Sequence, residues 1–157
     1  MIMIKFFFYI IYFTLFINKN LLFSIEPPKT LIIKDLLNSD SNIVVELNDQ
    51  IHVHYDGWLF DKSVDTENNC DAKGKKFDSS KEKPYRPEPI PFSFRIGKGI
   101  VIPGWELGLL KMKEGSKRCL VIPHQLAYGH RSFDDIIPAY STLIFEVHLL
   151  EIQKNKP

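Results

Sequence analysis

Residues 92–115, which read FSFRIGKGIVIPGWELGLLKMKEG, decide the fold because they predict a strand that leads into a short helix. Phe92, Phe94 and Ile96 alternate with polar residues, which is the period-two pattern of a half-buried strand. Gly97 interrupts this pattern. We therefore expect the strand to end at about residue 96.

The second half of this stretch predicts the helix. Apolar side chains recur at helical spacing at Trp105, Leu109 and Met112. Pro103 is typical of a first helical turn, and Gly115 is typical of the left-handed residue after a helix end. Gly108 is a poor helix former, so its place inside the helix indicates close approach to a sheet. On its own, an indole presented to a sheet is most often a plain core residue.

The composition is that of one globular domain, with 157 residues, 45% hydrophobic residues and no internal repeat. The formal net charge is +1, and once Lys5 and Lys19 are set aside, 18 basic residues face 19 acidic ones. Nucleic-acid binding needs a basic surface against the phosphates, so this balance argues against a nucleic-acid partner.

Residues 1–24 have the composition of a secretory signal. Lys5 precedes an apolar run from Phe6 to Ile17, about half the length that a membrane-spanning helix needs. A second, shorter apolar patch follows, so an uncleaved membrane anchor is the alternative. We expect export to the periplasm, the endoplasmic reticulum lumen or the cell exterior, with cleavage near Ser24 favoured. A start codon assigned too far upstream is the remaining alternative.

The rest of the chain divides into a linker at 25–30, a domain at 31–152 and a tail at 153–157. Cys70 lies in a polar loop and Cys119 in a predicted strand, and nothing in the sequence indicates that they pair.

The first part of the domain predicts short strands at 31–35 and 43–47. The segment Ile51–Tyr55 then alternates strictly, so that His52 and His54 share one face. Two histidines at this spacing can bind a metal ion, but no third ligand is in sight. We expect a solvated face and no metal site.

Residues 61–76 are polar, and their acidic and amide side chains partly match a calcium-binding loop. The matching odd positions are Asp65, Glu67, Asn69 and Asp71. Cys70 stands where that loop needs glycine and Lys76 where it needs glutamate, so a solvated insertion is expected instead. The proline-rich segment 81–91 predicts a loop or an irregular edge.

Further strands are expected at 118–122 and 143–149, with a long loop from Leu126 to Pro138 between them. Sequential antiparallel strands with one helix packed on a single face make an α+β domain. Its groove would have Trp105 as the floor. The expected walls are Tyr55, Phe77, Phe92, Val101, Ile102, Tyr128 and Phe145.

Five segments recur as an ordered set: VHYDGWL (53–59), KKFDSS (75–80), FSFRIGKGIVIPGWELGLLKM (92–112), LAYG (126–129) and IIPAYSTLIFEVHLL (136–150). Together they resemble the FKBP-type peptidyl-prolyl isomerases, the macrolide-binding immunophilins, over about residues 31–152. The resemblance implies a curved antiparallel sheet wrapped around one short helix. It also implies isomerisation of Xaa-Pro bonds with no metal and no cofactor.

The resemblance assigns the family's site to ten residues of this chain. Four are expected to be catalytic: Asp78, Tyr55, Tyr128 and Phe145. Six are expected to bind substrate: Phe77, Phe92, Val101, Ile102, Trp105 and Ile137. The implied partners of this monomer are proline-containing polypeptides and rapamycin-type macrolides, and a membrane only through an uncleaved N-terminal segment.

Three departures from the family pattern stand out. The loop at 61–73 is longer, and so is the segment at 81–91. The basic residue that often pairs with the pocket aspartate therefore has three candidates, Lys81, Lys83 and Arg86. In the loop after Tyr128, Phe133 and Asp134 with Asp135 replace smaller or less charged residues, which alters what enters the groove.

Three alternatives stay open. Without the resemblance, Asp78 reads as a turn cap before two serines. The groove can serve a low-turnover chaperone or peptide-binding module, and an exported surface or virulence factor can act through the extra loops.

Overall fold

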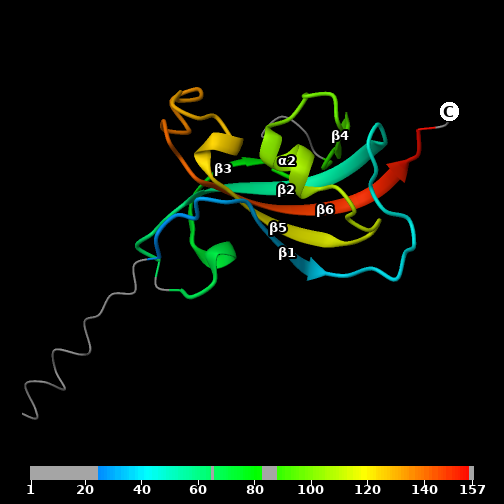
Figure 1. Ribbon diagram of the computed structural model, residues 1–157, viewed down its shortest axis with the longest axis horizontal. Coiled ribbons are helices and arrows are strands. Elements are labelled where there is room, and N and C mark those ends of the chain that lie inside the picture. The colour runs from blue at the N-terminus through cyan, green and yellow to red at the C-terminus, as the bar shows by residue number, and fades with distance from the viewer. Residues whose placement is uncertain (1–24, 65, 83–87, 156–157) are drawn as a thin grey trace, which may run out of the picture.

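The computed structural model describes residues 25–64, 66–82 and 88–155; the expected signal or anchor at 1–24 lies outside these ranges. The described residues form one six-stranded antiparallel sheet that curves around a short helix, which confirms the α+β class (Figure 1). The strands are β1 (Ile32–Leu37), β2 (Gln50–Phe60), β3 (Lys73–Ser79), β4 (Phe92–Arg95), β5 (Lys117–Ile122) and β6 (Leu143–Gln153). The helix α2 spans Pro103–Gly108, and the short 3-10 turns η2 and η3 span Asn69–Asp71 and His124–Leu126.

The sheet has the order β1-β5-β6-β2-β3, with β4 also paired to β2. The first half of β2 pairs with β4, as in Ile51 opposite Phe94, and the second half pairs with β3, as in Gly57 opposite Asp78. Strands β3 and β4 therefore share one edge of β2. The segment between them, at 80–91, carries no strand in its described part, as its prolines predict.

The core lies between the concave face of the sheet and α2. Apolar residues that alternate along β2 and β6 point to this face and are fully buried or nearly so: Ile51, Val53, Leu143, Phe145, Val147 and Leu149. They meet Trp105 of α2, and Leu109 and Met112 of the segment that follows it, so the three residues are buried together as their spacing predicted. A Cβ on Gly108 would lie 2.7 Å from Leu120 Cδ2, so this glycine permits the close approach that we expected.

The helix is shorter than predicted. We expected it to end just before Gly115, but α2 ends at Gly108. The guanidinium of Arg118 explains this end, because Nη1 donates hydrogen bonds to the carbonyls of Gly108 (2.9 Å) and Leu110 (3.2 Å). Nε of the same side chain donates to Asp35 Oδ1 at 2.6 Å. Arg118 thus satisfies the last helical carbonyls and joins them to β1.

The strand expected at 43–47 is absent from the described residues. Val44 forms only an isolated bridge with Lys113. Val45 is fully buried, but its backbone bonds to Lys111 and Met112 rather than to the sheet. The apolar residues at 43–47 thus indicate burial against the segment after the helix and not a strand.

The two cysteines pair, although nothing in the sequence indicated it. Cys70 and Cys119 form a disulfide that links residues 49 positions apart. Cys119 is fully buried and alternates with Leu120, which faces the main core, so its sulfur points to the convex face of the sheet. The insertion that carries Cys70 packs on this face, and the expectation of a solvated insertion is therefore wrong in its last part. The buried residues of this second cluster are Cys70, Ala72, Cys119, Val121 and Ile144.

Candidate active site

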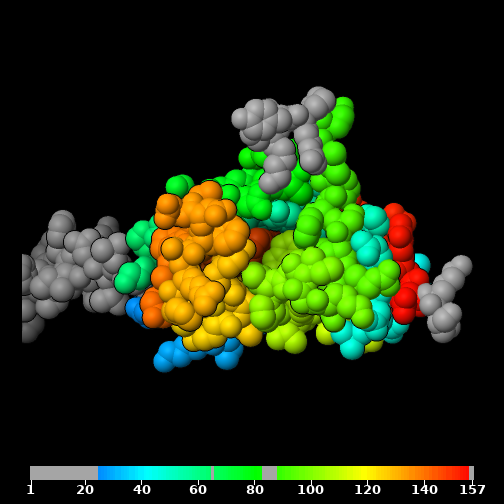
Figure 2. All heavy atoms as spheres, turned by 90° about the horizontal axis from the view of Figure 1, so that it is seen from above, coloured from blue at the N-terminus to red at the C-terminus, as the bar shows by residue number. Residues whose placement is uncertain are grey.

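A cavity of about 440 Å³ opens between the loop before α2 and the long loop between η3 and β6. Figure 2 shows the surface hollowed between these two segments, drawn in green and in yellow to orange. The lining residues are Tyr55, Phe77, Asp78, Phe92, Gly99, Ile100, Val101, Ile102, Trp105, Tyr128, Phe133 and Phe145. Nine of the ten site residues read from the sequence are among them. The tenth, Ile137, lines a neighbouring cavity instead.

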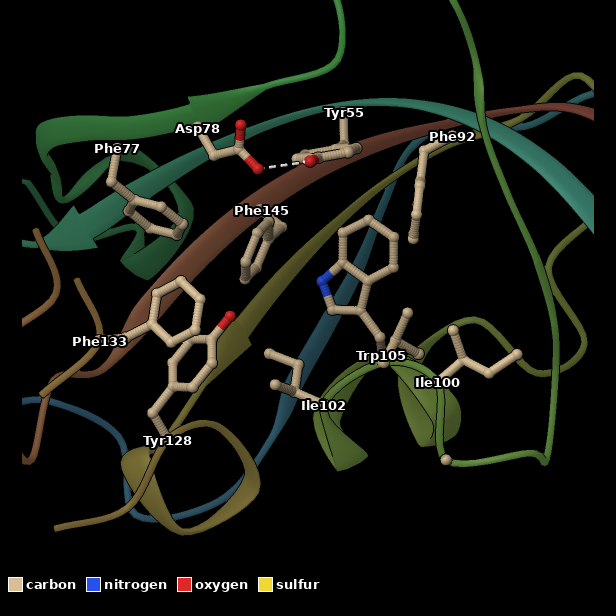
Figure 3. A pocket seen from close by; sticks show the side chains of 12 residues that line it. Tyr55, Phe77, Asp78, Phe92, Ile100, Ile102, Trp105, Tyr128, Phe133 and Phe145 are labelled. Carbon is tan, nitrogen blue, oxygen red and sulfur yellow. Dashed lines mark hydrogen bonds between the residues drawn. The ribbon is translucent and has the colours of Figure 1, made fainter. Parts of the chain in front are cut away.

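Trp105 forms the floor of the cavity. Its ring meets Tyr55 and Phe145 edge to face, with the ring centroids 5.2 Å apart in both pairs. Only 4% of Trp105 is exposed. Its indole nitrogen has no hydrogen-bond partner among the described residues and lies on the side of the ring that faces Phe145 (Figure 3). The interlocking rings hold the floor rigid and apolar.

Strand β2 contributes a glycine where two aromatic walls meet. Phe77 and Phe145 contact each other edge to face, with centroids 5.5 Å apart. A Cβ on Gly57 would lie 2.9 Å from an atom of each ring. A side chain at this position would therefore push the two rings apart and change the cavity wall.

Tyr55 and Asp78 form the polar rim of the cavity. The Tyr55 hydroxyl donates a hydrogen bond of 2.5 Å to Asp78 Oδ2, and the Ser79 N–H donates one of 2.8 Å to Asp78 Oδ1 (Figure 3). Burial first, and the Asp78 carboxylate second, raise the pKa of Tyr55. The phenol therefore stays protonated and remains a donor at neutral pH.

Of the three basic candidates for a partner of Asp78, Lys81 is placed elsewhere. Its Nζ lies 2.7 Å from Asp56 Oδ2, and Lys76 Nζ lies 2.9 Å from Asp56 Oδ1. Burial acts to raise the pKa of Asp56, but the hydrogen bonds from Lys81, Ser79 and Lys76 outweigh it and lower the pKa to about 2. Lys83 and Arg86 lie outside the described residues.

Tyr128 lies opposite the polar rim, with its hydroxyl directed toward the centre of the cavity (Figure 3). Phe133 stacks on its ring at a centroid distance of 4.8 Å and an interplanar angle of 24°. Burial first, then the negative charges of Asp78 and Asp134, raise the pKa of Tyr128. A protonated phenol thus faces any occupant of the cavity and can donate a hydrogen bond to it.

The loop before α2 forms the remaining wall and contains two lining residues that sequence reasoning missed, Gly99 and Ile100. Ile100 is 59% exposed and belongs to the apolar run that continues to Ile102, which was the available signal. Glu106 of α2 holds the loop. Its two carboxylate oxygens accept the N–H groups of Gly97 (2.6 Å) and Gly99 (2.9 Å).

The paired histidines of β2 bond to neighbouring hydroxyls. His54 Nδ1 lies 3.0 Å from Ser80 Oγ, and His52 Nδ1 lies 2.6 Å from Ser93 Oγ. Within residues 25–64, 66–82 and 88–155, no group of three or more His, Cys, Asp or Glu side chains is placed to hold a metal ion.

Comparison with known protein families identifies the family of the chain. A family model described as FKBP-type peptidyl-prolyl cis-trans isomerase matches residues 42–150, more than half of the chain. The chain belongs to this family. The FKBP-type match contains every residue that lines the cavity, so the resemblance read from the five segments is confirmed.

Individual FKBP-type proteins agree with this assignment. FK506-binding protein 2B from Rhizopus delemar is 41% identical over 134 residues, which cover 83% of this chain and 56% of that protein. Peptidyl-prolyl cis-trans isomerase FKBP2 from Homo sapiens is 45% identical over 107 residues, which cover 68% and 63%. FK506-binding protein from Neisseria meningitidis serogroup C is 41% identical over 123 residues, which cover 78% and 96%. The chain thus spans less than two thirds of the first two proteins and nearly all of the third.

Proposed function

We propose that residues 31–152 form a peptidyl-prolyl cis-trans isomerase domain that acts on Xaa-Pro bonds of polypeptides. The observation that carries this proposal is the aromatic cavity above Trp105, which is closed by apolar walls and edged by polar groups at Tyr55, Asp78 and Tyr128. Residues 25–30 and 153–157 are the linker and the tail of this domain.

Isomerisation requires rotation about an amide bond with partial double-bond character, at a barrier of about 18–20 kcal/mol. No covalent bond is made or broken, so the protein contributes by binding the rotated amide better than the planar one. A planar amide is more charge-separated than a twisted one and loses more when it leaves water. Transfer into an apolar cavity therefore lowers the barrier.

The geometry of the cavity supports the following residue roles. Trp105 supports the pyrrolidine ring from below. The walls around it come from Phe77, Phe92, Val101, Ile102 and Phe145, the last of which also abuts the rotating bond. The Tyr128 hydroxyl donates a hydrogen bond to a substrate carbonyl, and Asp78 orients Tyr55 and polarises the rim. Ile137 supports the wall from the neighbouring cavity.

The same walls suit an apolar macrocycle, and we propose that the domain binds rapamycin-type macrolides. The cavity volume of about 440 Å³ accommodates the part of such a ligand that resembles a prolyl ring. Two of the relatives described above carry the name FK506-binding protein, which supports a macrolide ligand.

We also propose that the protein is exported. The order of charge and apolar residues in 1–24 supports a signal or an anchor. The disulfide between Cys70 and Cys119 supports an oxidising compartment, where such bonds persist. Within the described ranges, no helix is long and apolar enough to cross a membrane.

A protease-coupled assay on a short Xaa-Pro peptide tests the proposed activity. The protein should accelerate isomerisation, and rapamycin should abolish the acceleration. Peptide binding without acceleration would replace the enzyme with a peptide-binding module. If folded protein neither binds the peptide nor accelerates its isomerisation, the proposal is overturned.

A further inference from the structure

The prolyl cavity adjoins a second cavity that the proposed mechanism does not use. It measures about 220 Å³ and is lined by Phe77, Asp78, Tyr128, Phe133, Asp134, Ile136 and Ile137. The first four of these residues also line the prolyl cavity. A polypeptide that places its proline above Trp105 can therefore extend a neighbouring side chain into the second cavity.

Phe133, one of the four residues that line both cavities, is the first residue of a tight turn. Ile136 N–H donates to the Phe133 carbonyl at 3.0 Å, and Phe133 N–H donates to the Ile137 carbonyl at 2.9 Å. The central residues Asp134 and Asp135 are both left-handed, with φ of 48° and 53°, as in the tightest hairpin turns. This closed turn fixes Phe133 against Tyr128, so the second cavity exists before any ligand arrives.

The second cavity combines apolar walls with a carboxylate at its edge. Phe133 and Ile136 are 46% and 42% exposed, so apolar surface remains for an incoming side chain. Within the described ranges, no lysine, arginine or histidine forms an ion pair with Asp134, although Arg131 lies only three residues before it. Asp134 lines the second cavity, and its negative charge helps to raise the pKa of Tyr128.

This combination fits one class of side chain. Lysine and arginine cover apolar surface with their aliphatic stems and keep the charged head at a polar edge. We propose that the second cavity is a specificity subsite that receives a lysine or arginine next to the substrate proline, with its stem on Phe133 and its charge at Asp134. This inference rests on the proposed isomerase function of the prolyl cavity.

The test compares matched peptides with the full-length protein. Peptides that differ only by Lys, Glu or norleucine beside the proline, on either side in two series, are followed by NMR exchange without a protease. In at least one series, kcat/KM for Lys should exceed that for Glu by about two- to fivefold at low salt, the range for a partly exposed ion pair. The difference should shrink as salt screens the charges.

Two variants in the same turn separate the subsite from general surface charge. Asp134→Asn should lower the Lys-to-Glu ratio clearly, although the Asp78 carboxylate remains in the lining. Asp135→Asn is the matched control, because Asp135 is also left-handed but lines neither cavity, and it should keep the ratio. Asparagine tolerates left-handed backbone, so both variants should fold.

Equal rates for Lys and Glu peptides in both series, or equal loss of the ratio in both variants, would overturn the subsite. Acceleration of no peptide would overturn the proposed isomerase function instead. In that case fluorescence anisotropy gives the dissociation constants of the Lys and Glu peptides. Their ratio in the wild type and in the two variants then tests the subsite.

Discussion

The Tyr55 hydroxyl donates a hydrogen bond of 2.5 Å to Asp78 Oδ2, and this bond ties β2 to β3 at the mouth of the prolyl cavity. Both side chains face the cavity, beside Phe77 and Phe145 (Figure 3). The carboxylate also accepts the Ser79 N–H, so it is part of the local structure as well as of the rim. Stability and activity can therefore be separated at this position.

Asp78→Val should lower activity several-fold and leave the melting temperature unchanged or higher. Valine is similar in size and apolar, and replacement of an enclosed polar group is nearly neutral when its partner can find water. Tyr55 is half-buried and lines the open cavity, so its hydroxyl has that access. Melting curves and peptide isomerisation rates of this variant show whether Asp78 contributes to activity or only to stability. If Asp78 only caps a turn, stability falls by about 1 kcal/mol and the rate per folded molecule holds.

Tyr55→Phe is the matched control for the same bond. It removes the hydroxyl and keeps the ring that packs on Trp105 and Phe145. If the bond orients Asp78 for function, the rate should fall in this variant too. A rate equal to that of the wild type would assign the effect of Asp78→Val to the carboxylate alone.

Glu106→Gln should weaken substrate binding more than it destabilises the fold. The two carboxylate oxygens of Glu106 each accept one N–H group of the loop that carries Ile100. Glutamine keeps one acceptor oxygen and replaces the other with an NH2 group, so one of these hydrogen bonds is lost. The loop should loosen and KM should rise about two- to tenfold, the effect of losing about 0.5–1.5 kcal/mol. Steady-state kinetics together with a melting curve check this. An unchanged KM would show that the loop keeps its shape without Glu106.

Removal of the disulfide should cost stability. The bond closes a loop of 49 residues, and such a constraint is worth about 2–4 kcal/mol. Cys70→Ala with Cys119→Ala should therefore melt well below the wild type, and reductant should lower the melting temperature of the wild type but not of the double variant. A wild type indifferent to reductant would show that the bond is absent or inaccessible.

Asp56 gives a pH dependence with a defined sign. The pKa of Asp56 is lowered from 3.8 to about 2. Its contribution to the free energy of unfolding is therefore fully present above about pH 4 and is lost as the pH falls through about 2. The shift corresponds to stability on the order of 2 kcal/mol at neutral pH. Asp56→Asn should be less stable by about that amount at pH 7, and the gap should close near pH 2. Thermal melts across this range would contradict the assignment if the gap stayed constant.

The cavity could be predicted in part because some of its residues lie on regular, short-range patterns, and the five family segments indicated the others. The spacing of Trp105, Leu109 and Met112 indicated that they are buried together, and Phe145 lies on a strand with alternating apolar residues. Ile100 was missed although it precedes Val101 and Ile102 on the same loop, because no periodicity there indicates which side chains enter the cavity.

Long-range relationships could not be predicted. The disulfide depends on Cys119 facing the convex side of the sheet and on the insertion folding back to that side. At the early end of the helix, the Gly108 carbonyl accepts a hydrogen bond from Arg118, which lies ten residues later on β5. Both are consequences of how the sheet curves, and local sequence carries no signal for them.

The central claim is that this cavity lowers the barrier to Xaa-Pro rotation, and NMR exchange on a single proline peptide tests it most directly. With catalytic amounts of protein, the cis-trans exchange rate should rise in proportion to protein concentration, and one equivalent of rapamycin should return it to the uncatalysed rate. An uncatalysed rate in the presence of protein whose melting curve shows it to be folded would contradict the account.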